Sequence, residues 1–110
     1  EEAIRVGKGP YDMIAFAYCG LATCFQAMGI YEKAVNYFVC YLDVARKMKD
    51  DEIECGALNN LGVAEYSIGN YTVAIADHLQ GLQIATKRDD QPSRMKSFAN
   101  LGKWKYPAYF

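Results

Sequence analysis

Several kinds of sequence feature are absent from this chain. Among its 110 residues, no apolar run reaches the roughly 18 residues that a transmembrane helix needs. The first residues, Glu1 to Arg5, lack both the basic and the apolar region of a signal peptide. No segment alternates apolar and polar residues over a sustained length, so no β-sheet is expected. These absences predict an all-α protein that does not insert into a membrane, and we expect it in the cytoplasm.

The chain also lacks an excess of charge of either sign. Its formal net charge is -1, and 23% of its residues are charged. A protein that follows the phosphates of a nucleic acid needs a basic excess on one face. The near-neutral balance therefore indicates that the partner is not a nucleic acid.

Histidine occurs once, and the cysteines show no metal-binding spacing. His78 has no other His or Cys near it in sequence, and none of the four cysteines forms a C-x-x-C pair. A zinc site needs such ligands close together, so we predict no metal and no other cofactor. Each cysteine falls where a small apolar residue suits a helix, which indicates reduced thiols rather than disulfides.

No catalytic arrangement stands out in the sequence. Asp77 adjoins His78, but successive side chains on a helix point about 100° apart, so the two do not form a proton-transfer pair. A Ser-His-Asp order and a glycine-rich phosphate loop are both absent. We therefore predict that the chain is not an enzyme and that His78 is a partly buried helical residue.

What the sequence does contain is an internal repeat with a period of 40 residues. Gly20-Leu21-Ala22, Asn60-Leu61-Gly62 and Asn100-Leu101-Gly102 are separated by that distance each time. The same shift aligns further residues with one another: Gly29 with Gly69, Tyr31 with Tyr71, Ala34 with Ala74, Leu42 with Leu82, and Ala45 with Ala85. A fixed period of this length predicts a stack of small helical units.

Glycine, proline and acidic residues divide the chain into helices. We expect helices over residues 11–28, 31–48, 52–68 and 71–87, with a fifth that begins near Ser93. Residues 1–10 are then the end of an earlier unit, and 11–50 and 51–90 are two whole units. Residues 91–110 begin a further unit or form a divergent C-terminal helix. This division predicts an all-α fold of antiparallel helix–turn–helix units, within a segment of a longer protein.

Small residues at repeating positions predict close contacts between the two helices of a unit. Ala22 and Gly62 on the first helices are expected to face Ala34 and Ala74 on the second helices. Two helices approach closely only where the side chains between them are short. The stretch 57–85 shows this pattern most completely.

The combined pattern resembles the tetratricopeptide repeat, whose unit carries W-x2-L-G-x2-Y, then A-x3-F, then P in about 34 residues. The first unit matches through Tyr18, Leu21, Ala22, Phe25, Gly29, Tyr31, Ala34, Phe38 and Leu42. The second matches through Leu58, Leu61, Gly62, Gly69, Tyr71, Ala74, Ile75 and Leu82. The long units look like those of Leu-Gly-Asn-repeat (Pins-type) signalling modulators and of rapsyn, although Leu61-Gly62 is followed here by Val63. A period of 40 also falls in the range of HEAT and armadillo repeats.

The resemblance implies a right-handed α-solenoid, a superhelix whose concave groove is lined by the first helix of each unit. Such a groove usually holds an extended peptide or a helix of a partner protein. The groove positions map onto the following residues: Thr23, Gln26, Asn59, Asn60, Val63, Tyr66, Lys96, Asn100 and Lys103. Asparagine amides suit this role because they both donate to and accept from a peptide backbone. The two lysines favour an acidic partner.

The sequence thus predicts a scaffold that binds a protein or peptide partner. Two alternatives remain open: a regulatory or sensor domain of a larger enzyme or signalling protein, and a structural part of a cytoskeletal or ciliary assembly. Two whole units are fewer than the roughly three that a stable stack needs. We therefore expect the repeat ends to be covered by further repeats or by self-association, including helix exchange between chains.

Overall fold

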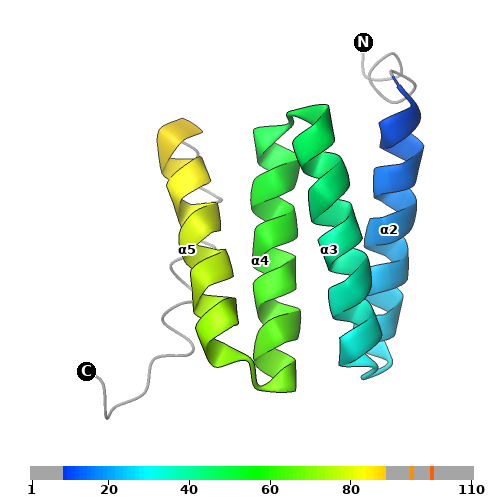
Figure 1. Ribbon diagram of the computed structural model, residues 1–110, viewed down its shortest axis with the longest axis vertical. Helices are drawn as coiled ribbons and strands as arrows, with labels where there is room; N and C mark the ends of the chain where they lie inside the picture. The colour runs from blue at the N-terminus through cyan, green and yellow to red at the C-terminus, as the bar shows by residue number, and fades with distance from the viewer. Residues whose placement is uncertain (1–8, 89–94, 96–99, 101–110) are drawn as a thin grey trace.

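Residues 9–88 of the protein form four helices. The computed structural model describes residues 9–88 together with Met95 and Asn100, and this part of the chain contains no strand. The helices are α2 (Pro10–Ala27), α3 (Tyr31–Met48), α4 (Asp51–Ile68) and α5 (Tyr71–Arg88), which lie side by side in chain order (Figure 1). All four predicted helices are confirmed, each to within one residue at either end. Of the predicted fifth helix only Met95 and Asn100 are described, and both have a helical backbone.

The helix boundaries follow from residues with special backbone properties. Pro10 opens α2, where its missing N–H would have no partner in any case. Gly29 and Gly69 adopt φ angles of 80° and 103° at the turns inside the two units, a region that glycine enters without steric cost. Lys49 takes the equivalent left-handed conformation (φ 55°) at the end of α3, between the units.

The junction between the two units is held by an N-cap. The Asp50 carboxylate accepts a hydrogen bond from the backbone N–H of Ile53 at 3.1 Å, which satisfies one of the free donors at the start of α4. The acidic residues Asp51, Glu52 and Glu54 follow in the first turn, where they interact favourably with the helix dipole.

Asp50→Ala is expected to lower the free energy of unfolding by about 1 kcal/mol, because the cap is lost and Ile53 N–H is left without this acceptor. Urea unfolding followed by circular dichroism measures the change. Asp51→Ala is the matched control, since it removes a neighbouring charge and leaves the cap in place. Equal losses in the two variants would show that charge, rather than capping, stabilises this junction.

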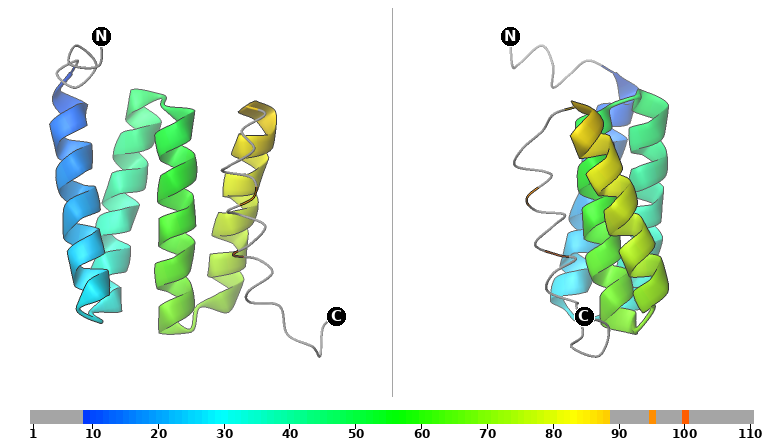
Figure 2. Two further views of the ribbon diagram at one scale, coloured as in Figure 1. Left: turned by 180° about the vertical axis from the view of Figure 1, so that it is seen from behind. Right: turned by 90° about the vertical axis from the view of Figure 1, so that its left-hand side faces the viewer.

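Each helix packs mainly against its neighbours in sequence. α2 packs against α3, α3 against α4, and α4 against α5. Seen from the side, α2 and α4 lie toward one side of the molecule and α3 toward the other, and α5 runs obliquely in front of α4 (Figure 2). Successive first helices therefore share a layer, as a repeat of helical hairpins requires. No helix of the described residues is long and apolar enough to cross a membrane.

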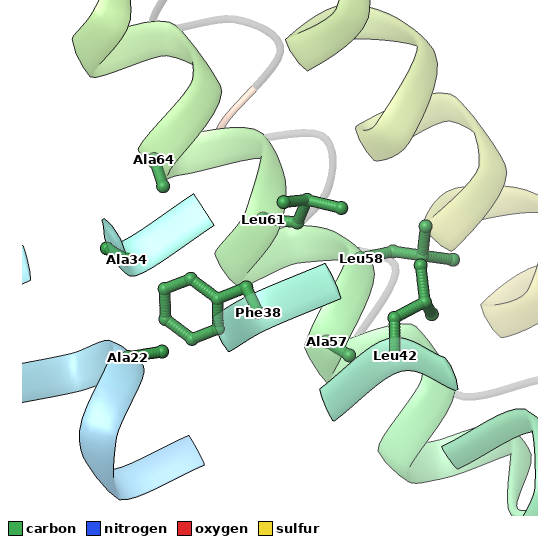
Figure 3. Close-up of a cluster of buried hydrophobic side chains, with 8 residues drawn as sticks. All are labelled: Ala22, Ala34, Phe38, Leu42, Ala57, Leu58, Leu61 and Ala64. Carbon is green, nitrogen blue, oxygen red and sulfur yellow. The ribbon is translucent and has the colours of Figure 1, made fainter. Parts of the chain in front are cut away.

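The core is a cluster of small and large apolar side chains shared by α2, α3 and α4. Phe38 of α3 lies at its centre, 1% exposed, and Ala22 of α2 points toward its ring (Figure 3). The cluster consists of Ala22, Ala34, Phe38, Leu42, Ala57, Leu58, Leu61 and Ala64. The alanines let the helix axes approach, so that one aromatic ring fills the space between three helices. Ala22 and Ala34 are both fully buried in this cluster, and that they face each other stays a prediction.

Candidate functional site

The predicted groove residues within the described part of the chain come mainly from α2 and α4, the helices of one layer. Thr23 of α2 is exposed, and Asn60 and Val63 of α4 are half-buried. Asn60 and Val63 are three residues apart and so share one side of α4, and Thr23 is the counterpart of Val63 under the 40-residue shift. Asn100 is half-buried on a helical backbone. Lys96 and Lys103 lie outside the described residues.

Gln26 and Tyr66 occupy equivalent positions under the 40-residue shift. Both are half-buried. The ring of Tyr66 lies 5.0 Å from that of Tyr71, at an interplanar angle of 55°, so Tyr66 packs onto the start of α5. The Thr23 hydroxyl donates its proton to the carbonyl oxygen of Cys19 at 2.7 Å. The hydroxyl oxygen of Thr23 can still accept a hydrogen bond.

Asn59 does not face a groove, and the expectation for this residue was wrong. Its side chain is 1% exposed and points toward α5, where Asn59 Oδ1 lies 2.7 Å from His78 Nδ1. Because an amide oxygen only accepts, the His78 proton on this contact sits on Nδ1. The physical reason is direct: Asn59 is one position removed from Asn60, and 100° of rotation carries it from the outer side of α4 to the interface.

A polar cluster thus lies inside the contact between α4 and α5. Asn59 Nδ2 donates to Cys55 Sγ at 3.9 Å, and the Cys55 thiol donates to the carbonyl of Gly81 at 3.3 Å. His78 is fully buried, and Cys55 is 1% exposed. Because the three side chains are buried, they have the surroundings of a structural cluster, and the hydrogen bonds compensate for the burial of polar atoms.

Gly62 makes room for the histidine ring. A Cβ atom added at Gly62 would lie 2.4 Å from His78 Nε2 and 2.6 Å from His78 Cδ2, well inside van der Waals contact. The imidazole therefore packs directly on the backbone of α4. The prediction that Gly62 faces a small residue missed this contact, since its neighbour is the ring of a large one.

The repeat itself held the signal for this cluster. Under the 40-residue shift, Asn59 and His78 replace Cys19 and Phe38, and Gly62 replaces Ala22. In the second repeat, the positions of Cys19 and Phe38 thus both carry a polar residue, and the position of Ala22 carries the smaller glycine. A joint change of that kind indicates that the two positions touch, because a lone polar residue in a core is costly.

Two carboxyl groups lie near each other across the same helix pair. Glu65 is 9% exposed and accepts a hydrogen bond from Asn70 Nδ2 at 2.8 Å. Asp77 Oδ2 is buried and accepts no hydrogen bond within the described part of the chain. Burial and the negative charge of Glu65 raise the pKa of Asp77 to about 6, and Arg46 opposes the shift.

The free energy of unfolding is expected to decrease as the pH rises from about 4 to about 6, because the pKa of Asp77 is about 6 in the folded state. Its pKa is higher in the folded than in the unfolded state, so the folded state binds more protons there and loses stability as the pH rises. Asp77→Asn should therefore stabilise the fold at pH 7 by roughly 1 kcal/mol, a value reduced for partial solvation, and should have less effect at pH 4. Urea unfolding at the two pH values tests this. An equal effect at both would assign the change to something other than the charge.

Neither of two surface hollows contains the predicted groove residues. One, of about 970 Å³, is open and runs along α5 between Ala76 and Lys87. The other, of about 310 Å³, lies at the ends of α3 and α4 and includes Glu65 and Asn70. Within residues 9–88 and the two isolated described residues, no three His, Cys, Asp or Glu side chains gather as metal ligands would.

No model of a known protein family matches the chain, and no curated protein matches it. A function for the chain therefore has to follow from its own fold and surface.

Proposed function

We propose that this chain is a non-enzymatic scaffold built from tetratricopeptide-like hairpins, and that it binds an extended peptide or a helix of a partner protein. The observation that carries the proposal is the layer of α2 and α4, which aligns equivalent positions of two repeats on one side of the molecule (Figure 2). Continued with the same 40-residue step, such pairs generate a right-handed superhelix with a concave groove.

The side chains on this layer suit a peptide ligand. Asn60 can donate to and accept from a peptide backbone, Thr23 keeps a free acceptor, and Val63 offers an apolar contact. None of these three side chains is charged, so they do not select for a partner of either charge. Lys96 and Lys103 belong to the same predicted set and favour an acidic segment of the partner.

The four cysteines support a reducing compartment for this activity. None of Cys19, Cys24, Cys40 and Cys55 is joined to another in a disulfide. Structural disulfides are typical of oxidising compartments, whereas free thiols are usual in the cytosol. We place the scaffold in the cytoplasm on this ground.

Binding can be tested with peptides selected from a displayed random library against the whole chain. We expect backbone amide shifts in NMR titrations to cluster at Thr23, Asn60 and Val63, and we expect Asn60→Ala to weaken binding several-fold, as the loss of one neutral hydrogen bond of about 1 kcal/mol would. Gln80→Ala, an exposed amide on α5, is the matched control and should leave the affinity unchanged. Shifts confined to α3 and α5, or a failure to select any peptide, would contradict the proposal.

A further inference from the structure

Within the described residues, one side of α2 is exposed although its counterpart in the second repeat is buried. In α4 this side carries Ala57, Leu61 and Ala64, which are buried in the core cluster shared with α3. Under the 40-residue shift the same positions in α2 are Ala17, Leu21 and Cys24. All three are exposed, Leu21 to 43%.

This side of α2 is apolar along its whole length. Ile14 is 42% exposed and Met28 is 66% exposed, so they extend the row formed by Ala17, Leu21 and Cys24. We call these five residues the α2 seam. The only charged residue of α2 is Asp12, which is not part of the seam. A helix that is apolar beyond its core-facing side is buried in its working form.

The seam has no counterpart of the charged residue that forms an ion pair between the two repeats. In α4 the counterpart of Ile14 is Glu54, which pairs with Arg46 of α3 at 3.0 Å. An isoleucine at this position cannot pair with an arginine of a helix resembling α3. The seam therefore suits a partner surface without charge, and the seam itself is such a surface.

The spacing of the seam makes it complementary to itself. Its residues follow one another at intervals of three and four, the a and d spacing of a coiled coil. Large residues (Ile14, Leu21, Met28) alternate with small ones (Ala17, Cys24). In an antiparallel pair related by a two-fold axis, residue numbers of facing positions add to a constant. With a sum of 38, Ile14 faces Cys24 and Ala17 faces Leu21, so every large residue of these pairs meets a small one.

We propose that two copies of this chain pair through their α2 seams, antiparallel and about a two-fold axis, with Ile14 against Cys24 and Ala17 against Leu21 of the second copy. The 18 residues of α2 span about 27 Å, and one side of a helix is about 10 Å wide, so each copy buries a few hundred Å². Standard stable interfaces bury about 800 Å² on each partner. The small area predicts a reversible dimer that dissociates on dilution.

Sedimentation equilibrium over a wide concentration range tests the pairing with the whole chain. The wild type should follow a single monomer–dimer equilibrium. Ala17→Glu should be monomeric throughout, because the new carboxylate would be buried against Leu21 of the second copy. Phe16→Glu is the matched control: Phe16 is 82% exposed on another side of α2, so its replacement should leave dimerisation unchanged.

Three results would overturn the proposal. A wild-type chain that stays monomeric at the highest concentration has no such interface. A series of growing oligomers would indicate head-to-tail contacts, which do not close. Loss of the dimer with Phe16→Glu and not with Ala17→Glu would place the contact outside the seam. Circular dichroism checks that each variant keeps its helices.

Cross-linking tests the register independently of any loss of folding. In the proposed pair, Ile14→Cys brings a thiol opposite Cys24 of the second copy, so oxidised glutathione should form disulfides between position 14 and Cys24 by thiol exchange. The two native Cys24 residues are separated by about 10 residues along the seam, roughly 15 Å, which is beyond disulfide reach. The wild type should therefore not form a Cys24–Cys24 link. Such a link, found by peptide mass spectrometry, would contradict the register.

Discussion

Gly62→Ala is expected to destabilise the fold by about 1–3 kcal/mol, although alanine is the better helix former. The new methyl group would lie 2.4 Å from His78 Nε2, and the ring is fully buried between the helices. To avoid this clash, either the two helices move apart or the His78 ring leaves its position over α4. Moving the ring disturbs its contact with Asn59. The intrinsic gain from glycine to alanine in a helix is about 0.5–1 kcal/mol and is smaller than this cost.

Gly56→Ala is the control on the same helix. An added Cβ at Gly56 would meet no atom within 4 Å, so this variant should gain the roughly 0.5–1 kcal/mol of helix propensity. Urea unfolding compares the two variants. A double variant of Gly62→Ala with His78→Ala should be less destabilised than the sum of the single changes, because the ring that causes the clash is gone. Simple additivity would mean that the contact does not determine the stability of this helix pair.

Phe38→Ala is expected to cost about 3–5 kcal/mol, the largest effect of any single substitution considered for this chain. Phe38 is 1% exposed and is surrounded by cluster residues from α2, α3 and α4 (Figure 3). The neighbours on α2 and α4 are mostly small, so they cannot refill the space left by the ring. Since a small domain has about 5–15 kcal/mol of stability in total, the variant should unfold at far lower urea or not fold at 25 °C.

Val39→Ala provides the comparison for Phe38→Ala. Val39 adjoins Phe38 in α3 but is 47% exposed, so its truncation should change the stability by no more than about 0.5 kcal/mol. Phe38→Leu keeps most of the buried apolar volume and should fall between the two. If Phe38→Ala and Val39→Ala cost the same, the cluster is not the source of the stability of the three helices.

The helices could be predicted from the sequence because their limits depend on local chemistry. Gly29 and Gly69 end first helices where a left-handed residue is needed, and Asp50 starts one by capping it. Such signals act within a few residues and need no tertiary information. Lys49 shows the limit of this reasoning, because it adopts a left-handed φ without being glycine.

The candidate site was less predictable, since the direction of a side chain depends on packing between helices. A resemblance places Asn59 and Asn60 together as groove residues, yet only Asn60 remains on the outer side of α4. Asn59 is buried because His78 offers it a partner 19 residues away. No local signal marks that pairing, and only a comparison of the two repeats with each other would have indicated it.

The neighbour-by-neighbour order of packing has a kinetic consequence. Each helix pair that packs is joined by a turn of two or three residues, between α2 and α3, α3 and α4, and α4 and α5. Short loops lose little entropy on closing, and folds with such local contacts reach the native state in microseconds to milliseconds. Phe38 of α3 lies in the cluster that α2, α3 and α4 share, and so connects the local helix pairs with one another. The ring that contributes most to stability is therefore also where three locally formed helices become one cooperative unit.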